Sequence, residues 1–370
     1  MEITMMLSER ETMYLYVSIV LLSSIAYLVY DYLDTYSSGV RIKVWKRGSA
    51  FSPSACIFII ISLLVALIPL INRNCGTDTP NYYRSYSNPY RQSHDVLFYY
   101  IFRILNHFTS DPKTGIGIIG LITIAPLVIV ISKKSHLYVR WLVILSYMTT
   151  LYFYDYNYTR MMMASTIIII AYSYLLDHNK KTGLILLGIS VLLHQSSIIV
   201  FAVYFIALFL IKYRKILVLT TGALVFMFIR NPGYFFEFVT YDRYTSYIEM
   251  LNVDNVTLGI GTTIIAIPLL LILIYYNKKI EDRYIYNLFF ISIIFNVSVS
   301  VLGYYISVAS RISKMCFTMN SLYMVPYILK NVELSDNEKK MLYFFQICYC
   351  FLMFFMLQKS FKYIGIMPYY

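Results

Sequence analysis

Charged side chains are scarce in this sequence, and their scarcity argues against a soluble fold. Only 14% of the 370 residues are charged, against about 25% in a typical soluble domain. In their place 59% of the residues are hydrophobic, and apolar runs of roughly 20 residues recur, each long enough to cross a hydrocarbon core of about 30 Å. Since backbone polar groups in lipid must be satisfied within a segment, these runs predict helices. We therefore predict an all-α polytopic membrane protein, with residues 1–370 forming one integral membrane domain.

Cysteine is also sparse, and its placement excludes two kinds of cross-link. An odd, scattered set of five cysteines provides neither a disulfide framework nor the spacing of metal ligands. The sequence also lacks a Walker A loop, a Gly-x-Gly-x-x-Gly fingerprint, a His-Glu-x-x-His pair and a Cys-x-x-Cys pair. We therefore expect no metal and no cofactor. The cysteines are Cys56, Cys75, Cys316, Cys348 and Cys350.

Acidic residues are few relative to basic ones, 19 against 31, which leaves a net charge of +12. In a soluble protein this excess would suggest nucleic acid. In a membrane protein, however, basic residues accumulate in the cytoplasmic loops. We therefore expect a membrane-lipid environment and no nucleic-acid partner.

The hydrophobic runs predict about twelve transmembrane helices. A further segment, 95–109, is short and carries charges, so we expect an interfacial helix rather than a span. The polar outer loops 72–113 and 231–257 are the expected catalytic and substrate-binding loops. The twelve predicted spans are roughly 12–30, 52–71, 114–132, 137–154, 161–176, 182–194, 196–211, 216–230, 258–276, 284–306, 312–330 and 341–358.

The uncharged stretch 182–211 decides the topology, because it can be read as one long helix or as two short ones that turn near His194. With two helices, one side of the membrane collects 13 lysines and 4 arginines in its loops, and the other side collects 4 lysines and 9 arginines. With one helix this segregation collapses beyond residue 211. We therefore predict two helices, a cytoplasmic lysine-rich side, and both termini on the outer side.

The outer side is rich in arginine, which the positive-inside rule does not explain. Arginine presents a planar fork that binds phosphate in bidentate fashion and stays charged when partly desolvated. These side chains therefore indicate recognition of an anion. Contact with lipid headgroups, or with carbonyls at helix C-termini, would explain some of them, Arg10 and Arg230 above all. The nine outer arginines are Arg10, Arg73, Arg84, Arg91, Arg103, Arg160, Arg230, Arg243 and Arg311.

The first outer loop contains two segments with helical patterns. Asp78 precedes a predicted helix over 79–87. It either caps that helix, orients an acceptor hydroxyl or positions an arginine. Asn88-Pro89 should end the helix. In the segment 95–109, Arg103 and His107 share a face. The opposite face is expected to be apolar and consists of Val96, Leu97, Tyr100, Ile101, Ile104 and Leu105.

Two later positions place ionisable groups at the outer mouth. Arg160 ends the very short loop 155–160, where it either binds substrate or pairs with Asp155. His194 lies at the predicted turn, where it is either a base or phosphoryl ligand, or simply hydrogen-bonded between helices. The long loop 231–257 contains two further candidate substrate-binding residues, Arg243 and Tyr244. A tyrosine ring can stack on a sugar ring.

These motifs together resemble the EpsG-like, Wzy-type polysaccharide polymerases of bacteria. Asp95 departs from the pattern, since a glutamate is expected there. The resemblance covers nearly the whole chain and rests on an ordered set: GTDTPNY (Gly76 to Tyr82), HDVLF (His94 to Phe98), YNYTRMMMA (Tyr156 to Ala164), LLGISVLLHQSSII (Leu186 to Ile199), RYTSY (Arg243 to Tyr247), ASRIS (Ala309 to Ser313) and a terminal PYY.

The resemblance implies a GT-C-like, metal-independent glycosyltransferase of the bacterial inner membrane with an outward-facing active site. It would join repeat units carried on polyprenyl pyrophosphate, for O-antigen, capsule or exopolysaccharide, alongside a flippase and a chain-length regulator protein. The implied catalytic residues are Asp78, Arg160, His194 and Arg311, with either Asp78 or His194 as the base. The implied substrate-binding residues are Arg73, Tyr82, Arg84, Arg91, Arg103, His107, Arg243 and Tyr244.

Three other functions fit parts of this pattern. A flippase for lipid-linked oligosaccharides would need arginines through its spans, whereas here they gather at the outer mouth. A sugar O-acetyltransferase would need a cytoplasmic His/Arg cluster, which the sequence lacks. An O-antigen ligase also uses outer arginine and histidine and is the nearest enzymatic alternative.

Overall fold

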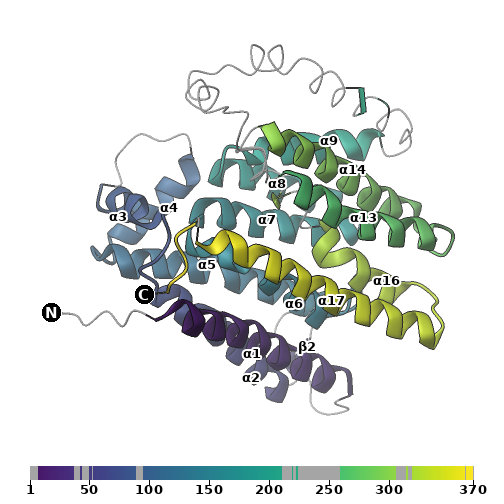
Figure 1. The fold of residues 1–370 in the computed structure, drawn as a ribbon, viewed down its shortest axis with the longest axis horizontal. Coiled ribbons are helices and arrows are strands. Elements are labelled where there is room, and N and C mark those ends of the chain that lie inside the picture. The colour runs from purple at the N-terminus through teal and green to yellow at the C-terminus, as the bar shows by residue number, and fades with distance from the viewer. Residues whose placement is uncertain are drawn as a thin grey trace. The chain divides into compact units, whose positions relative to one another are not determined.

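The computed structural model describes residues 7–36, 42–43, 50–51, 53–88, 95–210, 219, 222–223, 259–305, 314–315, 319–362 and 364–369. Helices dominate these residues (Figure 1), which confirms the predicted helical class. Among them, the strands are two-residue segments that form one antiparallel pair, β1 (Ile42–Lys43) with β2 (Ala50–Phe51).

The chain divides into two compact units, residues 1–195 with 325–370, and residues 196–324. In its described residues, the second unit contains the helices α9 (Ser197–Leu210), α13 (Gly259–Tyr275), η4 (Tyr276–Lys278), α14 (Arg283–Tyr305) and η5 (Asn320–Met324). The helices of the first unit are α1 (Glu9–Tyr36), α2 (Pro53–Asn72), α3 (Thr79–Ser87), α4 (Val96–Asn106), α5 (Pro112–Lys133), α6 (Arg140–Thr150), η1 (Tyr152–Tyr156), α7 (Thr159–Leu176), α8 (Lys180–Leu193), α16 (Val325–Asn331) and α17 (Asp336–Phe361).

Within the described ranges, five helices are long and apolar enough to cross a membrane: Glu9–Asp34, Pro112–Lys133, Thr159–Leu176, Arg283–Ser300 and Asp336–Gln358. The predicted count of about twelve is therefore not confirmed. The predicted span 137–154 contains an 11-residue α6 and a short 3-10 helix, η1. The helices α8 and α9 have 14 residues each, which is also short for a bilayer.

A break between α8 and α9 confirms that the stretch 182–211 is not one helix. Helix α8 ends at Leu193 and α9 begins at Ser197. His194 between them has extended backbone angles, φ −151° and ψ 110°, which a continuous helix does not allow. The side of the membrane on which this break lies stays a prediction.

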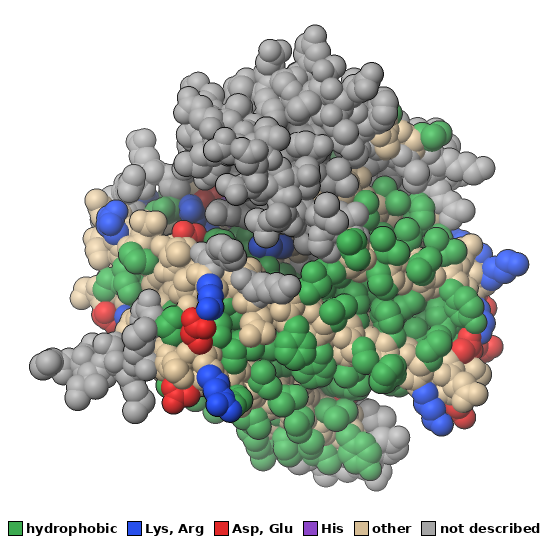
Figure 2. All heavy atoms as spheres, in the orientation of Figure 1, with side chains coloured by type: hydrophobic (Ala, Val, Ile, Leu, Met, Phe, Trp, Pro, Cys, Tyr) green, Lys and Arg blue, Asp and Glu red, His purple; other side chains and the backbone are tan. Residues whose placement is uncertain are grey.

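The surface of α17 fits a lipid environment. Figure 2 shows hydrophobic side chains over the part of this face where α17 lies. On α17 the exposed large side chains include Phe344, Leu352 and Phe355, each more than half exposed. Since water disfavours such a surface, this pattern supports a membrane protein.

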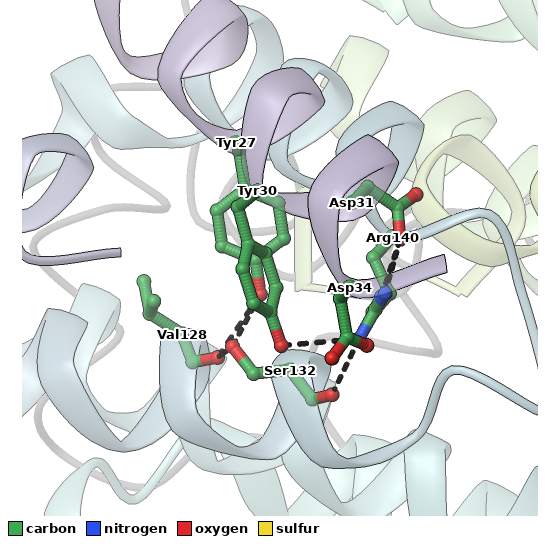
Figure 3. Close-up of polar contacts among 7 residues, drawn as sticks. All are labelled: Tyr27, Tyr30, Asp31, Asp34, Val128, Ser132 and Arg140. Carbon is green, nitrogen blue, oxygen red and sulfur yellow. Dashed lines mark hydrogen bonds and ion pairs between the residues drawn. The ribbon is translucent and has the colours of Figure 1, made fainter. Parts of the chain in front are cut away.

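The arginine predicted inside a span, Arg140, is held in a closed ion-pair cluster (Figure 3). It starts α6, and its side chain lies near the C-terminal ends of α1 and α5. Its Nε donates to Asp31 at 2.6 Å, and its Nη1 lies 2.9 Å from an oxygen of Asp34. The same Nη1 donates to the Tyr30 hydroxyl and to the Ser132 carbonyl, both at 3.1 Å. The cluster joins the start of α6 to the C-terminal ends of α1 and α5, and removal of one partner would leave a buried charge uncompensated.

The C-terminal turn packs against the first polar loop. The backbone N–H of Gly76 donates to the Gly365 carbonyl at 2.7 Å, and that of Thr77 to the Ile364 carbonyl at 3.0 Å. The Tyr369 hydroxyl donates to the Pro69 carbonyl near the end of α2 at 2.8 Å. The chain's last described residues thus hold the loop that follows α2.

Candidate functional site

The site is built on a loop, residues 73–78, that packs against the turn between η1 and α7. Asn157 in this turn accepts hydrogen bonds through its Oδ1 from the Asp78 N–H at 2.7 Å and from the Thr77 hydroxyl at 3.2 Å. Gly76 has a φ of +102°, and a Cβ there would lie 2.4 Å from the Tyr156 carbonyl oxygen. Glycine permits this backbone angle and this close approach, whereas a side chain at this position would clash.

Arg73, expected to bind substrate, is directed into the protein. It is 2% exposed. Its Nη1 donates to the Leu70 carbonyl at 2.6 Å, and its Nη2 donates to the Thr159 hydroxyl at 3.0 Å. Its guanidinium also lies over the Tyr156 ring, 5.8 Å from the centroid. These contacts favour a structural role, in which Arg73 joins the end of α2 to the start of α7.

Asp155 does not pair with Arg160, so that explanation of the arginine is wrong. The Asp155 side chain is fully buried, and within the described parts of the chain neither carboxylate oxygen has a hydrogen-bond partner. Burial raises the pKa of Asp155 to about 7, and the Arg73 guanidinium opposes this rise. Asp155 is therefore part of the protein interior beneath the turn.

The partner of Arg160 is Asp95, the residue before α4. Arg160 Nη1 lies 2.5 Å from Asp95 Oδ2, which is a short, charge-assisted hydrogen bond. The Asp95 side chain is 8% exposed and the Arg160 side chain 31% exposed. The pair therefore lies at the edge of the interior, with part of the guanidinium open to the exterior.

The end of α8 reaches the same carboxylate. The backbone N–H of Gln195 donates to Asp95 Oδ1 at 2.9 Å. His194 Nδ1 lies 3.9 Å from that oxygen, and the His194 side chain is 17% exposed. One aspartate thus brings together Arg160 from α7 and His194 from the end of α8, two residues that sequence analysis had placed in the catalytic centre.

Tyr82 completes this cluster from α3. The Arg160 guanidinium lies 5.8 Å from the centroid of the Tyr82 ring. Burial raises the pKa of the Tyr82 phenol, and Arg160 opposes the rise. The hydroxyl therefore stays protonated at neutral pH and can donate a hydrogen bond.

Helix α4 buries Phe98, Phe102 and Leu105, and of these only Leu105 belongs to the predicted apolar face. Val96 and Tyr100 of that face are at least half exposed, so the interfacial position of this helix stays a prediction. Phe98 and Phe102 are buried because their rings pack on other aromatic rings, a contact between helices that periodicity does not show. The cluster beneath the site consists of Tyr82, Tyr86, Phe98, Phe102, Leu105, Ile116, Ile119, Met163, Ala164 and Leu193.

The other predicted residues lie around this cluster or outside the described chain. Asp78 stands at the N-cap of α3, but its side chain makes no capping hydrogen bond. Arg84 is exposed in the last turn of α3, and His107 is exposed at the end of α4. Arg103 lies over the ring of Tyr100 at 5.2 Å. Four predicted residues lie outside the described residues: Arg91, Arg243, Tyr244 and Arg311.

Asp95 joins the site, although the sequence by itself indicates no role for it. Its position directly before a helix in a polar loop is also that of an ordinary N-cap. Its bond to Arg160 spans 65 residues of sequence, and a single sequence contains no signal for such a pairing. Among the described residues, no group of three or more His, Cys, Asp or Glu side chains is placed to hold a metal ion.

Comparison with known proteins identifies the family. The model of the EpsG family matches residues 54–370, which include every element of the site described above. No curated protein and no solved structure matches the chain significantly. Since the match covers more than half of the chain, this protein belongs to the EpsG family, whose members are Wzy-type polysaccharide polymerases.

Proposed function

We propose that this protein joins oligosaccharide repeat units carried on polyprenyl pyrophosphate, at the outer face of the bacterial inner membrane. Membership of the EpsG family supports the polymerase activity. The observation that supports a lipid-pyrophosphate donor is the position of the partly exposed Arg160. It lies at the start of an apolar helix, beside Tyr82 and His194. A fixed arginine at a membrane surface suits a pyrophosphate that is anchored in lipid.

The proposed reaction is a glycosyl transfer. A hydroxyl oxygen of the acceptor repeat unit attacks the anomeric carbon of the growing glycan. The bond from that carbon to the pyrophosphate oxygen breaks, and the polyprenyl pyrophosphate leaves with the bonding electrons. The hydroxyl proton passes to a base, either His194 or Asp78. The geometry favours His194, since it lies beside the Asp95–Arg160 pair.

Arg160 would stabilise the leaving pyrophosphate. Negative charge grows on the phosphate oxygens as the bond breaks, and donors already fixed in place stabilise this charge without reorganisation. Arg311 is proposed for the same role from its place in the family pattern, with Arg84, Arg91, Arg103, His107, Arg243 and Tyr244 as further contacts to substrate. Tyr82 would contribute its ring and its hydroxyl to the sugar or phosphate. A flippase supplies repeat units to the outer face, and a chain-length regulator sets the length of the product.

A deletion strain tests this function directly. Its surface glycan is separated on a gel and stained for carbohydrate. A single repeat unit on the acceptor, with no ladder, is the expected result. Complete loss of surface glycan, with lipid-linked units trapped inside the cell, would instead indicate a flippase. Long polymer that accumulates on the lipid carrier without transfer would indicate a ligase.

Purified protein gives the second test. The protein is reconstituted into vesicles with polyprenyl-pyrophosphate-linked repeat units alone, so that donor and acceptor are the same compound. Polymer that grows with time, with release of polyprenyl pyrophosphate, is expected. Absence of both products from folded wild-type protein would reject the proposed reaction.

A further inference from the structure

Asp95 stands at the N-cap of α4 but does not cap it. A capping aspartate accepts a hydrogen bond from a backbone N–H in the first turn of its own helix, and the Asp95 side chain makes no such bond. Its two oxygens bind other elements instead: Oδ2 binds Arg160 of α7, and Oδ1 accepts from Gln195 at the end of α8. This carboxylate therefore connects three helices at one point.

Two arginines of the first unit that pair with aspartates, Arg140 and Arg160, show what this arrangement does and does not achieve. The Arg140 side chain is 3% exposed and pairs with both Asp31 and Asp34, so carboxylates enclose its guanidinium. Among the described residues, Arg160 pairs with one carboxylate, and its side chain stays 31% exposed. A guanidinium has five N–H donors. One aspartate can thus fix the orientation of Arg160 and leave donors for an anion arriving from outside.

The same carboxylate also lies beside His194. At 3.9 Å, Asp95 Oδ1 and His194 Nδ1 are close enough for a strong electrostatic interaction once the ring is protonated. A histidine that takes a proton at one ring nitrogen becomes an imidazolium, and a carboxylate next to the other nitrogen stabilises it. Asp95 is therefore placed to serve the arginine and the histidine at the same time.

We propose that Asp95 is a positioning residue for the glycosyl transfer proposed above. It orients Arg160 toward the leaving pyrophosphate and His194 toward the acceptor hydroxyl. Asp95 itself does not touch substrate. This inference rests on the proposed function and adds to it the group that holds the two catalytic side chains in register.

Kinetics of reconstituted protein test the proposal through Asp95→Asn and Asp95→Glu. Asparagine keeps the shape and the acceptor for Gln195 but removes the charge that binds Arg160. Misplaced groups weaken transition-state binding, so kcat should fall at least about 100-fold while KM for the lipid-linked donor changes less than about threefold. Glutamate restores the charge, so kcat of Asp95→Glu should be at least about tenfold higher than kcat of Asp95→Asn. Asp111→Asn is the matched control, since Asp111 is an exposed N-cap on α5 and asparagine caps equally well.

A double-mutant cycle separates positioning from general damage to the fold. If Asp95 acts through Arg160, the double variant Asp95→Asn/Arg160→Lys should lose no more rate than the worse single variant. Losses that multiply would overturn the proposal, as would an Asp95→Asn rate within twofold of wild type. If both Asp95 variants fail equally and unfold at lower temperature, Asp95 is structural only. Wild-type protein that forms no polymer would reject the proposed function together with this inference.

Discussion

The Nη2 atom of Arg73 lies 3.0 Å from the Thr159 hydroxyl, so that an arginine at the end of α2 holds the first residue of α7. Arg160 is the next residue along the chain. The position of the partly exposed Arg160 therefore depends on a buried arginine whose own charge does not reach the surface.

Arg73→Ala should destabilise the protein. The change removes two hydrogen bonds and leaves the Leu70 carbonyl and Thr159 without their donor, at a cost of about 1–3 kcal/mol for each buried group left unpaired. We expect a lower unfolding temperature in detergent and reduced accumulation in the membrane. If Arg73→Ala instead keeps wild-type stability but has a higher KM for the donor, Arg73 binds substrate.

Arg160→Ala and Arg311→Ala should abolish long polymer while the protein still accumulates in the membrane. Loss of one donor to a developing negative charge typically lowers kcat by about 10²–10³-fold. The measurement is the glycan ladder of complemented deletion strains. Arg10→Ala is the control, because within the described part of the chain the Arg10 Nε donates to Tyr14 of its own helix, at 2.7 Å. Normal ladders from both site variants would reject the assignment.

His194→Gln and Asp78→Asn distinguish the two candidates for the base. Removal of a general base lowers the rate by about 10²–10⁴-fold. We expect this loss in His194→Gln, because His194 lies beside Asp95, and a rate within about tenfold of wild type in Asp78→Asn. The initial rate in reconstituted vesicles measures both. The reverse order would make Asp78 the base and would leave His194 as a phosphate ligand.

Gly76→Ala should disrupt the loop beneath the site. Its φ of +102° is unfavourable for alanine, and the new Cβ would meet the Tyr156 carbonyl. A strained backbone of this kind costs roughly 1–3 kcal/mol. Thermal unfolding and the glycan ladder should both be impaired. Gly222→Ala is the matched control, since no described atom lies within 4 Å of a Cβ there; equal effects of the two changes would contradict this account.

Asp155 should make the protein less stable as the pH rises. Burial raises its pKa from 3.8 to about 7, so the folded state binds this proton more tightly than the unfolded state does. Its contribution to stability is full below about pH 4 and is lost as the pH rises through about 7. Asp155→Asn cannot ionise and should flatten the fall in unfolding temperature between pH 5 and about 8. An unchanged slope would show that Asp155 is not the group responsible.

Asp111→Asn is a suitable comparison for that measurement. Hydrogen bonds from Thr114 lower the pKa of Asp111, so this carboxyl favours stability above its usual titration range. Asp111→Asn should therefore leave unchanged the fall in unfolding temperature between pH 5 and about 8.

The sequence by itself determined the helical membrane class and two helix boundaries. A helix over 79–87 that ends before Asn88, and the break at His194, both follow from local backbone chemistry. Hydrophobic length and residues that end helices act over a few positions, so one sequence contains them.

Tertiary structure alone decided the partners within the site. It paired Arg160 with Asp95 rather than with the neighbouring Asp155, and it directed Arg73 inward. Both outcomes depend on which helices lie side by side, and that is set by the packing of aromatic rings between α3 and α4 and by the contacts of α7 with α8. The energies of such long-range contacts arise only once the chain is folded, so no local pattern specifies them.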